Sequence, residues 1–332
     1  MLADRLLTSI DFHTGGIGMR LVTAGVPRPP GPTIADKRRH FEQHFDELRT
    51  GLCWAPRGHG SLLIAVLVDP VTPGAHFGLF FMHAGGYYVS CGEATIGAAT
   101  VAVSTGLVPR TGDETRVVID TEAGPIETIA HGDRHRVLAV TIRWTPAFVL
   151  RTGETVKLQD LGELAIDVAV GAGNVFAIVD AASLGLTVRR ESVDQIARRG
   201  MAVRAAINEQ LRVEAPGGDV VPIDNLLVQE PLAGGVSRNA LVWGAGQVDV
   251  APCGSGTCAR MALFHHRGDL GVGGSYVSEG ISGLAFTGRI AGETDVHGRR
   301  AILPEVTWTA YITGTSQFLF DPDDPLRGGL SP

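Results

Sequence analysis

A five-residue stretch occurs twice in this chain of 332 residues, and each copy opens a segment of small and apolar residues. The first copy is Cys91–Thr95 (CGEAT) and the second is Cys253–Thr257 (CGSGT). Each is followed by a glycine at the same distance, Gly106 after the first and Gly268 after the second. The copies lie 162 positions apart, about half the chain. This repeat predicts a duplicated half-molecule, in which each half points a thiol into a shared cleft.

The segments around the two copies extend the repeat. A helix capped by Thr33 is expected to run to about Leu52, because its apolar residues recur at helical spacing. A second amphipathic helix is expected over Val193–Arg212, at a similar distance before the second cysteine. Helices are also predicted at 91–105 and at 253–266. Strands are predicted at 9–13, 19–23, 62–68, 76–83, 87–90, 117–120, 126–130, 137–143, 165–170, 175–179, 221–228, 240–243 and within 302–320.

These elements predict an α+β fold with two pseudo-symmetric domains, each a curved, mostly antiparallel sheet around a central helix. A chain of this length also favours two domains over one core. The first half-domain is expected to comprise residues 1–128, with the C-terminal strands 305–332 returning to it. The second is expected to comprise residues 129–304. The 44 glycines predict frequent turns and short strands.

Composition excludes several classes of partner. The net charge of −7 gives no basic surface for nucleic acid. The longest apolar runs, near 62–68 and 78–82, are too short to span a bilayer, and the N-terminus has no long apolar stretch typical of a secretory signal. A cytoplasmic location with reduced thiols is therefore expected.

The four cysteines do not form a metal motif. None of them shows the CxxC spacing of a zinc or redox site, so no metal is expected. Cys53 ends a predicted helix, and Cys258 lies beyond the first turn of another, so both are interpreted as structural. Cys91 and Cys253 differ from them because each begins a helix.

A cysteine at a helix N-terminus lies beside unpaired N–H groups and a partial positive charge, which favour the thiolate and bind anions. Two such sites facing one substrate suggest inversion of a stereocentre. One thiolate removes the α-proton, and the opposite thiol returns a proton to the other face. Pyridoxal phosphate needs a lysine, and neither Lys37 nor Lys157 sits in a suggestive motif; a phosphate-binding P-loop is also absent. No cofactor is expected.

The motifs resemble those of the proline racemase family over almost the whole chain. Asp249–Thr257 is similar to the second cysteine motif of that family, and Gly85–Gly97 to the first. Further matches are Asp11–Gly16, Pro56–His59, Asn174–Phe176 and Phe286–Arg289. The family contains proline racemases, 4-hydroxyproline 2-epimerases and trans-3-hydroxyproline dehydratases. The resemblance implies the diaminopimelate epimerase-like two-domain fold, no cofactor, a small proline-like amino acid as substrate and a possible homodimer.

The resemblance also assigns site residues by position. Cys91 and Cys253 would be the acid/base pair. Asp249 would hold the substrate nitrogen, and Trp243 would form an aromatic wall. The substrate carboxylate would bind the backbone N–H groups of Gly92, Glu93, Gly254 and Ser255. The dehydratases of the family typically replace the second cysteine by threonine, so Cys253 favours inversion over dehydration.

Three departures from the family pattern concern the substrate. Glu93 replaces the usual histidine of the first motif, Val250 and Ala251 replace an Arg-Ser pair, and Ser61–Leu63 replaces an acid and an aromatic residue. Two carboxylates, Glu93 and Asp249, would then face the substrate amine. This arrangement favours a primary ammonium or a second basic group on the substrate, and it raises the pKa of a neighbouring thiol. The hypothesis is a substrate other than plain proline.

Other interpretations remain open at this stage. Glu93 can serve only to stabilise the helix dipole, Asp249 only to cap the approach to the helix, and Trp243 only as core. The two histidines His13 and His59 are interpreted as turn or core residues, and His265–His266 as a solvated helix end. Two alternative functions remain: a trans-3-hydroxyproline dehydratase, and a non-catalytic imino acid binder.

Overall fold

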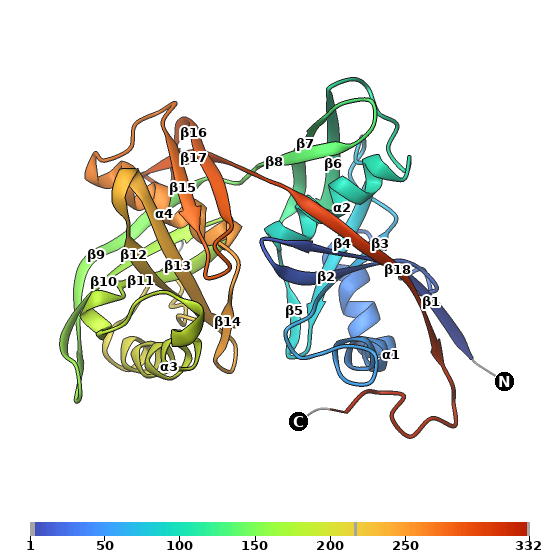
Figure 1. Ribbon diagram of the computed structural model, residues 1–332, viewed down its shortest axis with the longest axis horizontal. Helices are drawn as coiled ribbons and strands as arrows, with labels where there is room; N and C mark the ends of the chain where they lie inside the picture. The colour runs from blue at the N-terminus through green and yellow to red at the C-terminus, as the bar shows by residue number, and fades with distance from the viewer. Residues whose placement is uncertain (1–3, 216–217, 331–332) are drawn as a thin grey trace. The chain divides into compact units, whose positions relative to one another are not determined.

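The computed structural model describes residues 4–215 and 218–330, and these form two compact units (Figure 1). The first unit comprises Met1–Ile142 and Thr309–Pro332, and the second comprises Arg143–Trp308. The chain therefore leaves the first unit after β8 and returns to it with β18, the strand that runs from Ala310 to Phe320.

The first unit contains a mixed sheet. β1 pairs with β18 and with β2, β3 with β4, β4 with β5, and β6 with β7, all antiparallel. β2 pairs with β3, and β4 with β6, in parallel. The remaining strands of this unit are β1 (Arg5–Thr14), β2 (Ile17–Ala24), β3 (Leu63–Val68), β4 (Phe77–His83), β5 (Gly86–Tyr88), β6 (Glu114–Thr121), β7 (Gly124–Gly132) and β8 (Val137–Arg143).

The second unit contains a mixed sheet with a similar order. β11 pairs with β12 and β13 with β15 in parallel, while the other pairs are antiparallel. β17 pairs with β9 at Ala301 and Ile302, so the series of pairings returns to its first strand. The strands are β9 (Ala147–Leu158), β10 (Gly162–Gly171), β11 (Asn174–Asp180), β12 (Asn225–Pro231), β13 (Val236–Trp243), β14 (Gln247–Asp249), β15 (Ser275–Glu279), β16 (Ala285–Val296) and β17 (Arg299–Trp308).

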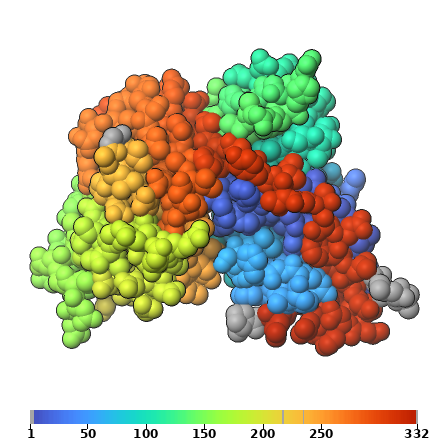
Figure 2. All heavy atoms as spheres, in the orientation of Figure 1, coloured from blue at the N-terminus to red at the C-terminus, as the bar shows by residue number. Residues whose placement is uncertain are grey.

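Each unit has one long amphipathic helix. α1 (Ile34–Cys53) begins at the predicted cap, where Thr33 Oγ1 accepts a hydrogen bond from the N–H of Asp36 at 3.0 Å. α3 (Val193–Gln210) buries Ile196, Val203 and Ile207 at 0% exposure, together with Gly200 and Arg204, while its opposite face is exposed and is seen at the surface in Figure 2 (yellow-green). α1 follows β2 and α3 follows β11, so each helix connects the two strands of a parallel pair.

Two shorter helices follow the cysteines. α2 (Gly92–Ser104) is buried from its first residue to Val103. α4 (Gly254–Arg267) packs against β9, β10, β11, β16 and β17. The glycine that follows each helix has a positive φ, +78° at Gly106 and +85° at Gly268, which explains why the repeat carries glycine at this offset. None of the helices in the described part of the chain has the length and apolarity that a bilayer crossing demands.

The structure confirms the four predicted helices and corrects several details. The strands are not generally short, since β1 has 10 residues and β9 and β16 have 12 each. β9, β14, β15 and β16 were not predicted, because glycines interrupt the alternation of β9 and β16 and because β14 and β15 have only three and five residues. Residues 221–224 precede β12 rather than belong to it. His265 is not solvated: it is 7% exposed, Nε2 lies 3.0 Å from a Glu293 carboxylate oxygen, and Nδ1 is hydrogen-bonded to the Leu270 carbonyl.

Candidate active site

The first half of the candidate site is the N-terminus of α2. Cys91 is the N-cap residue, with extended backbone (φ −145°), and is 9% exposed. Its carbonyl accepts hydrogen bonds from both the N–H and the hydroxyl of Thr95, at 3.0 and 2.7 Å. These two bonds fix the cysteine to the first turn. The backbone N–H groups of Gly92 and Glu93 belong to this turn, where helix N–H groups have no partner within the helix.

The side chain of Glu93 lies beside the thiol of Cys91. The Cys91 thiol donates a weak hydrogen bond to Glu93 Oε2 over 3.9 Å, and Glu93 is 7% exposed. A buried acid in this position acts on the sulfur as well as on the helix dipole, because a neighbouring anion disfavours thiolate. Glu93 is therefore part of the cysteine environment and not only a helix-terminal residue.

The N-terminal motif, Asp11–Gly16, contacts α2 and holds it in place. Thr14 Oγ1 donates a hydrogen bond to the Glu93 carbonyl at 3.1 Å. The ring of Phe12 lies against Gly97, so that a Cβ on Gly97 would approach Phe12 Cε2 to 1.8 Å. Gly97 is thus required by packing, and the Asp11–Gly16 motif holds α2 in place. Thr14 was not predicted as a site residue, although its position in that motif was the available signal.

The second half is the N-terminus of α4. Cys253 is the N-cap residue, is 4% exposed, and has φ 59° and ψ 101°, a conformation that costs energy for a residue with a Cβ. Its sulfur accepts a hydrogen bond from the N–H of Gly256 at 3.4 Å and lies 3.8 Å from Ser255 Oγ in a second hydrogen bond. A Cβ on Gly256 would lie only 3.0 Å from this sulfur. The backbone of residues 253–256 therefore leaves room for the thiol and donates a hydrogen bond to it.

The hairpin before α4 carries the other predicted residues of this unit. Asp249 ends β14, is 7% exposed, and accepts a hydrogen bond from the N–H of Ala251 at 2.8 Å. One of its carboxylate oxygens lies within 4.8 Å of Cys253 Sγ. Trp243 ends β13, is 8% exposed, and pairs with Gln247 of β14. The sequence thus placed Asp249 correctly near the thiol, while Trp243 lies at the other end of the hairpin.

A buried cation lies two turns further along α4. Arg260 is 0% exposed, hydrogen-bonds to the hydroxyls of Ser237 and Ser278, and stacks over the Tyr276 ring at 5.0 Å from the centroid. Sequence reasoning missed it. The available signal was a charged residue seven positions after Cys253 in a segment of otherwise small and apolar residues.

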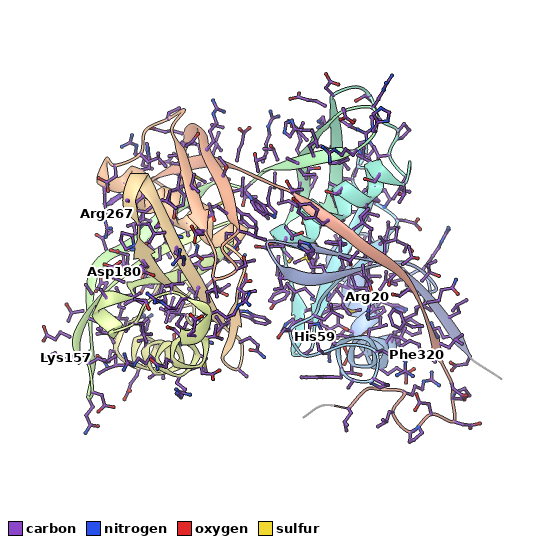
Figure 3. The ribbon with its side chains drawn as sticks, viewed as in Figure 1. Arg20, His59, Lys157, Asp180, Arg267 and Phe320 are labelled. Carbon is purple, nitrogen blue, oxygen red and sulfur yellow. The ribbon has the colours of Figure 1, made fainter. Side chains whose placement is uncertain are left out.

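Separate pockets lie away from these helix N-termini. One of about 410 Å³ in the second unit is lined by Asp180, Arg267 and Tyr276; Figure 3 labels the first two. Another of about 400 Å³ in the first unit is lined by Arg20 and His59, also labelled there. Arg20 pairs with Asp11 at 3.0 Å and donates to the Arg57 carbonyl at 3.0 Å, so these motif residues stabilise a loop.

The remaining cysteines have a different environment. Cys53 and Cys258 are both 0% exposed. Burial raises the pKa of the Cys53 thiol to about 12, which keeps it protonated and unreactive at neutral pH. The predicted division into two thiols at helix N-termini and two deeply buried thiols matches these positions. Chemically, each helix N-terminus combines a thiol, a carboxylate and backbone donors, a set suited to holding an anion next to an acid or base.

The chain is similar to known proteins over almost its full length. The family model described as "Proline racemase" matches residues 9–331. The chain is 36% identical over 336 residues to the proline racemase of Clostridioides difficile, 38% over 346 residues to the 4-hydroxyproline 2-epimerase of Streptosporangium roseum, and 37% over 335 residues to the trans-3-hydroxy-L-proline dehydratase of Burkholderia cenocepacia. Each alignment covers 99% of both chains.

Solved structures share the fold. A hydroxyproline epimerase from Agrobacterium vitis with bound trans-4-OH-L-proline superposes with a TM-score of 0.91 at 28% identity, over 100% of this chain and 96% of that one. A PhzF-family phenazine biosynthesis protein from Bacillus anthracis gives a TM-score of 0.63 at 13% identity, over 95% of this chain and 99% of that one. The neighbours thus agree with the fold class expected from the sequence, with a mixed sheet of many strands.

Proposed function

Because the chain belongs to the proline racemase family, we propose that it is a cofactor-independent isomerase that inverts the α-carbon of proline, 4-hydroxyproline or a related amino acid. The observation that carries this proposal is the full-length similarity to racemases and epimerases together with a cysteine at the N-terminus of a buried helix in each unit. The substrate class is a small amino acid, as in the epimerase with bound trans-4-OH-L-proline.

In the proposed mechanism, Cys91 and Cys253 are the acid and the base. A thiolate takes the α-proton as the C–H bond breaks, and the electron pair is delocalised into the substrate carboxylate. The other thiol then gives its proton to the opposite face of the carbanion, which inverts the centre. The mechanism requires both sulfurs to reach the same α-carbon. Each thiol is supported in this role by a buried position and a hydrogen bond at its helix N-terminus.

The groups proposed to bind the substrate come from the first turns of α2 and α4 and from the β13–β14 hairpin. Asp249 would hold the substrate nitrogen, and Trp243 would form a wall. The carboxylate would accept hydrogen bonds from the backbone N–H groups of Gly92, Glu93, Gly254 and Ser255, which lie in the first turns of α2 and α4. Such preorganised donors stabilise a developing carbanion by several kcal/mol in a dry site. The short distance between Asp249 and Cys253 supports a common role.

We also propose that the two compact units are pseudo-symmetric half-domains, each built around its cysteine helix. In each unit a parallel pair, β2–β3 or β11–β12, is joined through a long helix. A second parallel pair, β4–β6 or β13–β15, is joined through a short strand and the cysteine helix. The boundaries expected from the sequence, 1–128 with 305–332 and 129–304, stay a prediction, as does the homodimer.

Glu93 makes a substrate other than plain proline the preferred hypothesis. It is a buried carboxylate beside Cys91, at the position where the family usually has a histidine. With Asp249 it would supply two negative charges to the substrate amine, which favours a primary ammonium or a second basic group. Equal and rapid turnover of L- and D-proline would contradict this hypothesis.

A trans-3-hydroxyproline dehydratase is the second candidate, because a relative of that name is 37% identical over its full length. One thiolate would remove the α-proton, and the 3-hydroxyl would leave as water. Cys253 argues against it, since the family's dehydratases typically carry threonine at that position.

One experiment separates these functions. The protein is incubated in deuterium oxide with a panel of L- and D-amino acids that includes proline, both hydroxyprolines and a diamino acid, and α-deuteration, configuration and ketimine formation are followed. An isomerase gives α-deuterated product of inverted configuration. A dehydratase gives ketimine. Binding of a panel member without exchange would identify a non-catalytic binder. Cys258→Ala is the control, because it changes a deeply buried thiol of the same helix.

A further inference from the structure

The guanidinium of Arg260 is a buried cation with only neutral partners. Its hydrogen bonds go to the hydroxyls of Ser237 and Ser278, and its face lies over the Tyr276 ring. Within residues 4–215 and 218–330, no carboxylate lies in ion-pair distance of it, and its Nε is buried without a hydrogen-bond partner. A buried charge without a counter-ion is costly, so its retention indicates a role for the charge itself.

The surroundings of Arg260 connect it to Cys253. The two residues lie seven positions apart on α4, a spacing of two turns that places them on the same side of the helix. Ser278 Oγ receives Arg260 Nη1 at 3.3 Å and donates to the carbonyl of Pro252 at 3.3 Å, one residue before the thiol. Asn239 Nδ2 donates to the same Ser278 oxygen at 2.9 Å. The hydrogen bonds of Arg260 through Ser278 therefore support the strained backbone at Cys253. Its guanidinium also brings a positive charge to the same side of the helix.

The corresponding position in the other unit carries no charge. Ala98 lies seven positions after Cys91 and is 0% exposed. In its own unit the thiol of Cys91 donates a hydrogen bond to the carboxylate of Glu93. Cys253 instead accepts a hydrogen bond from the N–H of Gly256. Cys253 Sγ also lies 3.8 Å from Ser255 Oγ, and either atom can donate that hydrogen bond.

We infer that Arg260 is a positioning residue that stabilises the thiolate of Cys253, so that in the resting enzyme Cys253 is the base and Cys91 the acid. The inference rests on the two-thiol function proposed above. In the first half-reaction the Cys253 thiolate gains the α-proton and becomes a thiol, while the Cys91 thiol gives its proton to the carbanion and becomes a thiolate. In the resting form the first proton is therefore taken from the enantiomer whose α-hydrogen faces Cys253, and that turnover leaves the form that acts on the opposite enantiomer.

Other charged groups near α4 also act on the Cys253 thiol or on Arg260. Asp249 on β14 opposes the thiolate, since its carboxylate lies within 4.8 Å of the sulfur. Burial lowers the pKa of Arg260 below its ordinary value, and the charges of Tyr276, Cys253 and Asp180 offset part of this decrease. In the last turn of α4, Arg267 pairs with Asp167 of β10 and His265 with Glu293 of β16, while His266 is exposed. On the strands against the helix, Arg289 pairs with Glu305 and Arg300 with Glu293.

The test measures the pH dependence of cysteine alkylation. The full-length protein is treated with iodoacetamide from acidic to alkaline pH, and modification of the Cys91 and Cys253 peptides is quantified by mass spectrometry. In the wild type we expect the Cys253 midpoint to lie below that of Cys91. Arg260→Met should raise the Cys253 midpoint by about one pH unit and leave Cys91 unchanged, and Arg260→Lys should restore most of the difference. Arg267→Met, on the same helix but paired with Asp167, is the matched control.

Two results would overturn the inference. One is a Cys253 midpoint that does not change in Arg260→Met, or that changes together with Cys91, which would indicate a packing role only. The other is a wild-type Cys253 midpoint at or above that of Cys91. This comparison needs no variant, so it tests the inference even if Arg260→Met does not fold. Alkylation needs no substrate, so failure of this inference and failure of the proposed isomerase activity, read from α-deuteration, are distinguishable.

Discussion

The two cysteine helices share a motif but differ in their electrostatic surroundings. α2 is buried along its length by small and apolar residues, and its one charged side chain, Glu93, is an acid beside the thiol. α4 has the same cap position and the same terminal glycine, yet contains a fully buried arginine and ends in a basic turn. Cys91 has an extended backbone, whereas Cys253 has a positive φ.

The difference indicates how a duplicated site can divide a task. A reaction that inverts a carbon needs one thiol protonated and one ionised at the start of each turnover. Two identical half-sites would give no preference for which thiol is ionised. Glu93 beside Cys91 disfavours the thiolate there, and in the proposal above the Arg260 cation favours the thiolate of Cys253 against the opposing charge of Asp249. Divergence between the halves therefore serves the proposed chemistry.

The largest expected effect is the loss of either thiol. Cys91→Ser and Cys253→Ser should each lower the rate of inversion by about 10³-fold, because a hydroxyl is a much poorer proton donor and acceptor. The rate is measured by chiral chromatography with the best substrate of the panel. Cys258→Ala should keep at least a substantial part of the rate. If one of the two serine variants turned over normally, the two-thiol comparison would fail.

A smaller effect is expected where packing fixes each helix. Gly97→Ala would bring a Cβ to 1.8 Å from Phe12, and Gly171→Ala to 2.1 Å from the Ser255 carbonyl. We expect each to destabilise the fold by about 1–3 kcal/mol, measured by thermal or urea unfolding. Gly271→Ala is the control, because its Cβ would meet nothing within 4 Å and its φ is not positive. Equal stability of all three variants would show that neither contact restrains its helix.

We expect Glu93 to change the acidity of the Cys91 thiol. Glu93→Gln should lower the alkylation midpoint of Cys91 by about one pH unit, because the neighbouring anion is removed. Glu93→His restores the usual family residue and should shift preference toward proline. An unchanged Cys91 profile in Glu93→Gln would mean that the carboxylate serves the helix dipole alone.

The smallest effect concerns a thiol outside the site. Burial raises the pKa of Cys53 to about 12, above its value of about 8.5 in an unfolded chain. Its contribution to stability is therefore complete below about pH 8.5 and is lost as the pH rises toward the folded value. Unfolding free energies of the wild type and Cys53→Ala between these limits should converge as pH rises. Parallel curves would contradict the assignment.

Part of the site was predictable because it depends on local chemistry. A thiol before a glycine and a helical segment predicts an N-cap cysteine, and both cysteines occupy that position. The α1 cap at Thr33 was predictable for the same reason, since a side-chain oxygen satisfies a nearby N–H. β9 and β16 were not predicted, because long strands with exposed faces and internal glycines lose the alternation that identifies a strand.

By itself, the sequence determined the duplicated motif, the two cysteines at helix N-termini, the four helices and the family to which the chain belongs. Tertiary structure alone decided that Arg260 is buried without an acid partner, that Phe12 makes Gly97 obligatory, and that Glu93 lies against the Cys91 sulfur. The physical reason is the distance along the chain between the residues that interact. Caps and helix periods arise from residues within a few positions, whereas burial and charge balance depend on strands far away in the chain.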